Sequence, residues 1–210
     1  MQNMKNINSG GRVKVIVLVV IAGVILFVLL NFSYFAKLLG FYFSETFVTE
    51  QQREDQRQED GVPMEPDSIY IATLDIRAPI KYPESNAEAV IQKALIDGVV
   101  QYPKTAEIGK SGNTYIVGHS SDFAFSKGNY KTVFALLPNI ELGAEILVAN
   151  SEGKTFKYKV YENFVAKKTD LYLLGQNTNG KTILTLQTSY PIGTALQRYI
   201  VKAEFVEVVK

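Results

Sequence analysis

The sequence predicts a mainly β domain that follows one membrane-spanning helix. From about residue 66 to the end, short apolar runs alternate with polar positions and are separated by Gly, Pro and Asn, a pattern typical of many short strands. Near the start, residues 15–36 form a long stretch without a formal charge. Because helical patterns are few in the second part, a β-barrel or a β-sandwich is expected there, and periodicity alone does not separate the two.

The apolar stretch 15–36 predicts a transmembrane helix. At about 1.5 Å per residue it extends roughly 33 Å, close to the thickness of the bilayer hydrocarbon. Three basic residues precede it and only Lys37 follows closely, so residues 1–14 are expected in the cytoplasm and the rest outside it. A cleavable signal peptide is the alternative, but the run is long for one and no clean small-x-small site follows.

Residues 37–65 are expected to form an extracytoplasmic stalk. Acidic, basic and glutamine residues alternate through most of this segment with few apolar ones, so it lacks the side chains to build a core. Gly61, Pro63 and Pro66 would end any helix. The globular domain is therefore expected to cover residues 66–210.

Within that domain the elements are short. The expected strands are residues 69–72, 74–76, 78–80, 113–117, 144–149, 155–164, 181–188 and 195–208.

The turn sequence Asn150-Ser151-Glu152-Gly153 predicts a hairpin between two of these strands. Apolar residues at helical spacing predict a helix over 86–98, and shorter helices are expected at 130–136 and 169–174.

Composition narrows the classes of function. The net charge of +1 gives no electrostatic reason to bind nucleic acid. With no cysteine and one histidine, the common structural zinc sites and a disulfide framework are excluded. We expect no cofactor and no metal site, although the loop acids Glu162 and Asp170 leave calcium binding open.

Three residues are the candidates for chemistry. His119, the only histidine, follows a predicted strand and a glycine and precedes a loop, where scaffolds present reactive groups. Arg198 shares a strand face with Leu196 and Ile200, so it is either a snorkelling surface residue or a fixed cation that holds an oxyanion. Ser189 ends the segment Thr185-Leu186-Gln187-Thr188-Ser189.

This segment, with Gly118-His119-Ser120 and Arg198, resembles the sortase family, membrane-anchored cysteine transpeptidases whose strand motif reads T-L-x-T-C. The resemblance implies a closed eight-stranded β-barrel and a site of His119, Arg198 and the nucleophile position, here Ser189. It also implies that Thr188 shapes the site and that Leu171 contacts the substrate, although each of these two could be an ordinary strand or core residue.

The family chemistry further implies the partners. The substrate would be a secreted protein with a C-terminal sorting signal of the Leu-Pro-x-Thr-Gly type, and the acceptor an amine on the cell wall or a pilin. The enzyme would work at the cell surface, tethered by its one helix and without a cofactor.

Serine at position 189 leaves three hypotheses open. A hydroxyl ionises far less readily than a thiol, so this copy is expected to be an inactive or strongly impaired sortase, by laboratory substitution or natural divergence. The second hypothesis is a silent, membrane-tethered module that binds sorting signals. The third is a serine hydrolase or acyltransferase, which would need a carboxylate behind the histidine; Asp122 is the nearest in sequence.

Overall fold

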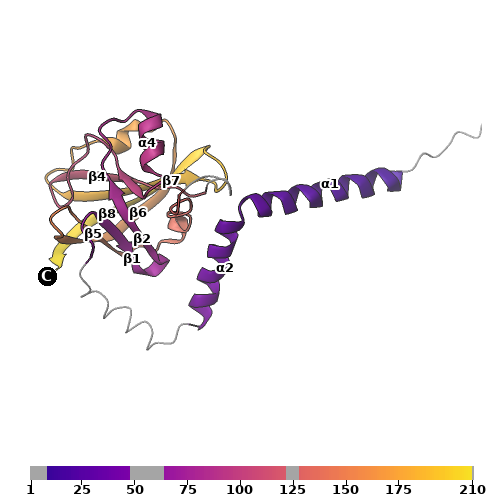
Figure 1. Cartoon of the computed structure of the whole chain (residues 1–210), viewed down its shortest axis with the longest axis horizontal. Helices are drawn as coiled ribbons and strands as arrows, with labels where there is room; N and C mark the ends of the chain where they lie inside the picture. The colour runs from indigo at the N-terminus through magenta and orange to yellow at the C-terminus, as the bar shows by residue number, and fades with distance from the viewer. Residues whose placement is uncertain (1–8, 48–63, 122–127, 210) are drawn as a thin grey trace, which may run out of the picture.

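Eight strands close into one β-barrel in the computed structural model, which describes residues 9–47, 64–121 and 128–209 (Figure 1). The strands are β1 (Ser68–Ile71), β2 (Ile76–Lys81), β3 (Val99–Gln101), β4 (Gly112–Val117), β5 (Glu145–Ala149), β6 (Thr155–Lys167), β7 (Thr182–Tyr190) and β8 (Gln197–Val209). Their order around the barrel is β1-β2-β3-β4-β7-β8-β6-β5, and β5 closes it by pairing with β1. The barrel expected from the sequence is therefore confirmed.

Two of the strand pairs are parallel, β2 with β3 and β4 with β7. Parallel neighbours need a crossover, and α4 (Glu88–Ala94) makes the first one, inside the range where a helix was expected. The connection from β4 to β7 contains β5, β6 and two 3-10 turns, η3 (Leu137–Asn139) and η4 (Leu171–Leu174). A third, η2 (Ala72–Leu74), separates β1 from β2.

The hairpin at residues 150–153 is confirmed, since β5 and β6 pair from Ala149↔Thr155 onward. The Asn150 side chain stabilises the turn, because its Oδ1 accepts from the amides of Glu152 and Lys154 at 3.1 and 2.9 Å.

The prediction of a helix at 130–136 is wrong. The segment is a run of turns, and the amide of Phe134 donates to the carbonyl of His119 at 2.9 Å instead of to its own segment. The Phe134 amide thus makes a tertiary hydrogen bond in place of a helical one. The spacing of apolar residues in the sequence does not predict such a bond.

Apolar residues pack on both sides of the sheet. Inside the barrel, alternate residues of every strand join Phe134 and Leu137 in the main core, in which Tyr158 is fully buried. A second cluster lies on the outer face of β3, β4, β6 and β8, where Ile91 of α4 and Leu173 of η4 pack with Tyr115 and Ile200. The outer cluster explains why part of β4 is buried on both faces.

A buried polar network fastens η4 to β4. Asn113 Nδ2 donates to the carbonyl of Leu173 at 2.9 Å, and Asn113 Oδ1 accepts from the hydroxyl of Thr185 at 2.7 Å. Beside it, Gln176 Oε1 accepts from the amides of Ala106 and Asn113 at 3.0 and 3.2 Å. The turn that carries Leu171 is thus fixed to the barrel by hydrogen bonds.

Two consecutive helices precede the barrel, α1 (Ser9–Leu30) and α2 (Phe32–Phe47). The stretch Val13–Leu30 is long and apolar enough to cross a membrane, and none of it is buried. The chain bends at Asn31, where the backbone amide and the side-chain Nδ2 both donate to the carbonyl of Phe27, at 3.1 and 2.9 Å. The expected span 15–36 therefore extends past a bend, and the first residues of the expected stalk are helical.

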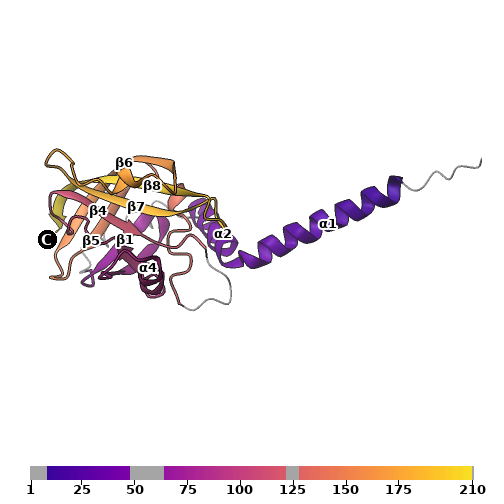
Figure 2. The same ribbon diagram turned by 90° about the horizontal axis from the view of Figure 1, so that it is seen from above.

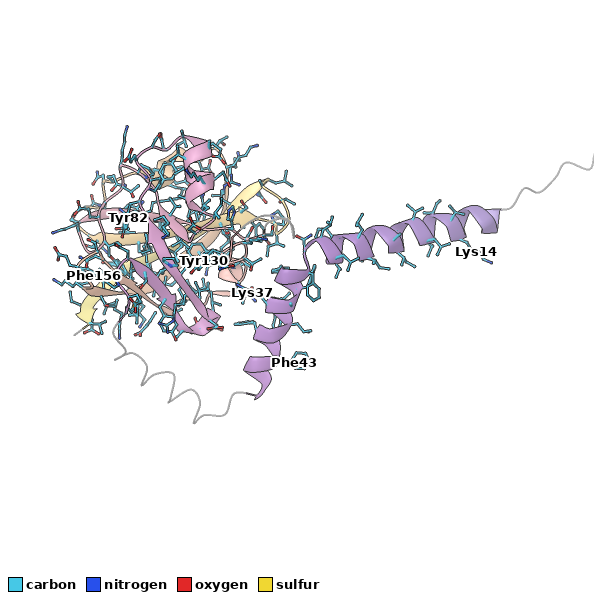
Figure 3. The ribbon with its side chains drawn as sticks, viewed as in Figure 1. Lys14, Lys37, Phe43, Tyr82, Tyr130 and Phe156 are labelled. Atoms are coloured by element: carbon cyan, nitrogen blue, oxygen red, sulfur yellow. The ribbon has the colours of Figure 1, made fainter. Side chains whose placement is uncertain are left out.

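Helix α2 lies between α1 and the barrel and runs across the direction of α1 (Figures 1 and 2). Lys37 points toward the barrel (Figure 3), where its Nζ donates to the carbonyl of Thr132 at 3.1 Å. Burial lowers the pKa of Lys37, and the carboxylate of Asp75 opposes that change. Leu38 and Phe41 pack against the main core, so α2 is part of the folded domain.

The network around Asn113 predicts a stability effect. We expect Asn113→Ala to lower the free energy of unfolding by about 1–3 kcal/mol, because the Thr185 hydroxyl and the Leu173 carbonyl lose a buried partner. Urea unfolding in detergent measures this change, with the exposed Asn129→Ala as the control. Equal stability of the two variants would contradict the role given to the network.

Candidate active site

The three residues singled out from the sequence lie at the same end of neighbouring strands. Strand β7 is paired on one side with β4 and on the other with β8. In the β7–β8 register, Ser189 lies directly opposite Arg198. In the β4–β7 register, the last pair is Val117↔Gln187, so the residues that follow β4 run alongside the end of β7.

Two hydrogen bonds continue this alignment beyond β4. The amide of Gly118 donates to the carbonyl of Gln187 at 3.0 Å, and the hydroxyl of Thr188 donates to the carbonyl of Gly118 at 2.9 Å. His119 follows Gly118 in the loop after β4, and Ser189 follows Thr188 on β7, so the backbone of His119 continues alongside the end of β7. The His119 carbonyl is held in turn by the amide of Phe134.

The site lies on the outer face of the barrel. Leu184, Leu186, Val201 and Ala203 belong to the interior core, whereas Ile200 belongs to the outer cluster. Because side chains alternate along a strand, Ser189 and Arg198 share the outer face. This face is open to solvent at its end, where both side chains are half-buried.

Arg198 is oriented by backbone carbonyls of the β7–β8 connection. Its Nη1 donates to the carbonyls of Gln197 and Ala195 at 2.9 and 3.3 Å. A guanidinium has five N–H donors in a planar fork, so donors remain beyond these two bonds. Arg198 is thus the register partner of Ser189, and its guanidinium keeps donors for a further acceptor.

An interaction that the sequence did not reveal lies behind the site. The Tyr115 hydroxyl donates to Gln187 Oε1 at 2.7 Å. Burial raises the pKa of this phenol, and the nearby Arg198 cation opposes that rise. Tyr115 therefore remains a neutral donor, and its bond to Gln187 supports β7 two residues before Ser189. Strand alternation, which puts Gln187 and Ser189 on one face, was the available signal.

Thr188 and Leu171 have different environments. Thr188 is only 1% exposed and its hydroxyl is bonded to Gly118. Leu171 is 73% exposed at the start of η4, whereas Leu173 of the same turn is buried in the outer cluster. Since Ala166 of β6 pairs with Arg198, η4 follows closely after the strand that flanks the site.

Gly118 is needed for space beside Phe134. A Cβ on Gly118 would lie 2.5 Å from the Phe134 ring. The φ of Gly118 is not in the left-handed region, so backbone conformation does not require a glycine here. The reason is close packing, which only the tertiary structure reveals.

Two other candidates give limited information. Asp122, the carboxylate considered for a serine triad, lies outside the described residues. Within the described ranges, no group of three or more His, Cys, Asp and Glu residues could hold a metal ion. Ser120, next to His119, is buried and its hydroxyl has no hydrogen-bond partner in the described part of the chain.

Comparison with known proteins links this chain to one family. The family model of the sortase domain matches residues 69–206. Sortase C-1 from Actinomyces oris is 24% identical over 76% of this chain and 84% of that one, with a TM-score of 0.57. A lid mutant of sortase A from Corynebacterium diphtheriae is 24% identical over 76% and 81%, with a TM-score of 0.56.

A third solved structure, the sortase D5 transpeptidase from Clostridium perfringens, is 23% identical over 79% of this chain and 94% of that one, with a TM-score of 0.54. These structural likenesses show the fold. No curated protein sequence matches the chain.

The close packing at Gly118 predicts that a larger residue there lowers the stability of the fold. We expect Gly118→Ala to lower the free energy of unfolding by about 1–3 kcal/mol, because the added methyl overpacks the Phe134 ring. The control is Gly40→Ala, since no atom lies within 4 Å of a Cβ there. Chemical unfolding monitored by circular dichroism makes the comparison, and a Gly118→Ala variant as stable as the control would refute the packing explanation.

Proposed function

Because the chain belongs to the sortase family, we propose that it is a membrane-anchored sortase-type transpeptidase in which serine occupies the nucleophile position. The proposed substrate is a secreted protein that carries a C-terminal sorting signal of the Leu-Pro-x-Thr-Gly type. The acceptor is an amine on the cell wall or a pilin, and no cofactor is required. Water in place of the amine would give hydrolysis.

One observation carries the proposal. Ser189 lies opposite Arg198 in the β7–β8 register, and the Thr188–Gly118 hydrogen bond aligns His119 beside it. The proposed nucleophile position, proton carrier and cation thus come from the neighbouring ends of β7, β4 and β8. These three roles are what acyl transfer requires.

In the proposed reaction, the side chain of residue 189 gives its proton to His119 and attacks the carbonyl carbon of the scissile peptide bond. Arg198 stabilises the oxyanion that forms, and His119 donates a proton to the leaving amine as the C–N bond breaks. The acyl group is then attached to residue 189. An acceptor amine attacks this acyl group, forms a new amide and releases the side chain of residue 189 with its proton restored.

Thr188 and Leu171 take different parts in this proposal. Thr188 acts as a positioning residue, because its buried hydroxyl holds the backbone next to His119. Leu171 is exposed on η4, which makes it a candidate contact for an apolar substrate side chain. Leu196, exposed at the start of the Arg198 strand, is a second apolar candidate that adjoins the site.

The proposed location is the outer surface of the cell membrane. Helix α1 has the length and composition of a span, and basic residues precede it. The positive-inside rule then puts the N-terminus in the cytoplasm and the barrel outside. Substrates and acceptors of the proposed kind meet the enzyme on that side.

The nucleophile position decides the activity of this copy. We expect Ser189→Cys to raise the rate of cleavage or transpeptidation of sorting-signal peptides by orders of magnitude, because a thiol ionises far more readily than a hydroxyl. Mass spectrometry of peptide products, with several amine acceptors, measures the change. The matched control is Ser151→Cys, which adds a thiol at an exposed position in the β5–β6 turn.

In the Ser189→Cys background, His119→Ala should nearly abolish turnover because the leaving amine then has no proton donor. Arg198→Ala should cost on the order of 2.7–4 kcal/mol of transition-state stabilisation if the cation acts like an oxyanion-hole donor. Arg198→Lys should restore only part of this, since an ammonium lacks the planar fork. Unchanged kcat/KM in the Arg198 variants would remove the residue from the mechanism.

The two other hypotheses have separate signatures. A silent binding module would bind sorting-signal peptides yet gain no activity with Ser189→Cys. A serine hydrolase would turn over as the unaltered protein and react with a fluorophosphonate probe at Ser189. In that case Asp122 would be the next residue to mutate.

A further inference from the structure

Helix α2 has one face fixed on the barrel. Lys37 bonds to the Thr132 carbonyl, and Leu38 and Phe41 pack against the core. At the start of the helix, the side chain of Asn31 lies against the β7–β8 connection, since a Cβ on Gly193 would be 3.0 Å from Asn31 Oδ1. Barrel and helix are therefore joined at both the core and the rim of the candidate site.

The opposite face of α2 is apolar and exposed. Phe32, Leu39 and Phe43 are 64%, 60% and 57% exposed. With the exposed Ala36 and Gly40 they recur at helical spacing and form one face without a charged residue. Phe43 points away from the barrel and toward the side on which α1 lies, whereas Lys37 points toward the barrel (Figure 3).

The position of this face identifies what covers it. Only Asn31 separates α2 from α1, which is long and apolar enough to cross a bilayer. A helix that starts where the span ends, and that runs across its direction (Figures 1 and 2), lies at the level of the membrane surface. From Phe32 to Phe43 the apolar face extends about 16 Å along that surface.

We propose that α2 is an interfacial helix, with its outer face, Phe32, Leu39 and Phe43, inserted at the surface of the bilayer that α1 crosses and its inner face carrying the barrel. Amphipathic helices of this kind bury their apolar face about 5–10 Å into the boundary between headgroups and acyl chains. Aromatic side chains are favoured at that depth.

This placement has a consequence for the candidate site. The β7–β8 connection, which contacts Asn31, joins the strand ends that carry Ser189 and Arg198. The candidate site therefore favours substrate chains that lie close to the membrane surface. This consequence for specificity rests on the proposed function.

The chain has no tryptophan, so a single introduced tryptophan reports its surroundings alone. We would reconstitute full-length Leu39→Trp and Phe43→Trp in vesicles that contain lipids brominated near the glycerol end of the acyl chains. The control is Val206→Trp, because Val206 is 51% exposed near the end of β8. Strand β8 ends on the side of the barrel away from α1 (Figures 1 and 2).

The expected result is blue-shifted emission from both α2 reporters, quenched by about half or more by the brominated lipids, as the interfacial depth requires. Val206→Trp should emit as a water-exposed residue and resist quenching. Red-shifted, unquenched emission from both α2 reporters would overturn the proposal. Blue-shifted emission without lipid quenching would also overturn it, in favour of a second copy or another segment of this chain. None of these readouts depends on catalysis.

Discussion

The double pairing of β7 is the constraint on which the candidate site depends. This strand is hydrogen-bonded in parallel to β4 and antiparallel to β8, so its register is fixed from both sides. A shift of one residue would send Ser189 to the barrel interior and Thr188 to the outer face. The interior core and the Thr188–Gly118 bond both oppose that shift. Packing energy is therefore what keeps residue 189 beside Arg198 and His119.

Packing in the outer cluster also fixes the position of the residues around the candidate site. Leu173 packs on β4 while Asn113 and Gln176 bond to the backbone around it. The exposed Leu171 is thus carried by a turn with little freedom to move. Buried neighbours hold this turn in one conformation, which gives a pre-organised surface. The entropy of ordering the turn is lost on folding and not on binding.

Helix α2 fixes the barrel relative to α1, the helix proposed as the membrane anchor. A flexible stalk would leave the barrel free to rotate above the bilayer, whereas α2 is packed on the core and on the β7–β8 connection. The bend at Asn31 joins a helix that is long and apolar enough to cross a membrane to one that packs on the barrel. In the proposed arrangement, the contacts that fold the domain also set the orientation of the candidate site relative to the membrane.

The sequence by itself determined the β class, the apolar helix and the candidates His119, Ser189 and Arg198, because alternation, hydropathy and motif spacing are local properties. It predicted the β5–β6 hairpin from the Asn150 turn for the same reason. It failed at β3, whose three residues are too few to show alternation.

Only the tertiary structure decided which local preferences would prevail. Residues 130–136 lost their helix because the Phe134 amide bonds to His119, and Gly118 proved necessary for the space that the Phe134 ring occupies. The face of α2 that meets the barrel was likewise set by Lys37 and Phe41 contacts with distant residues. Each of these outcomes depends on partners remote in the chain, which sequence periodicity does not encode.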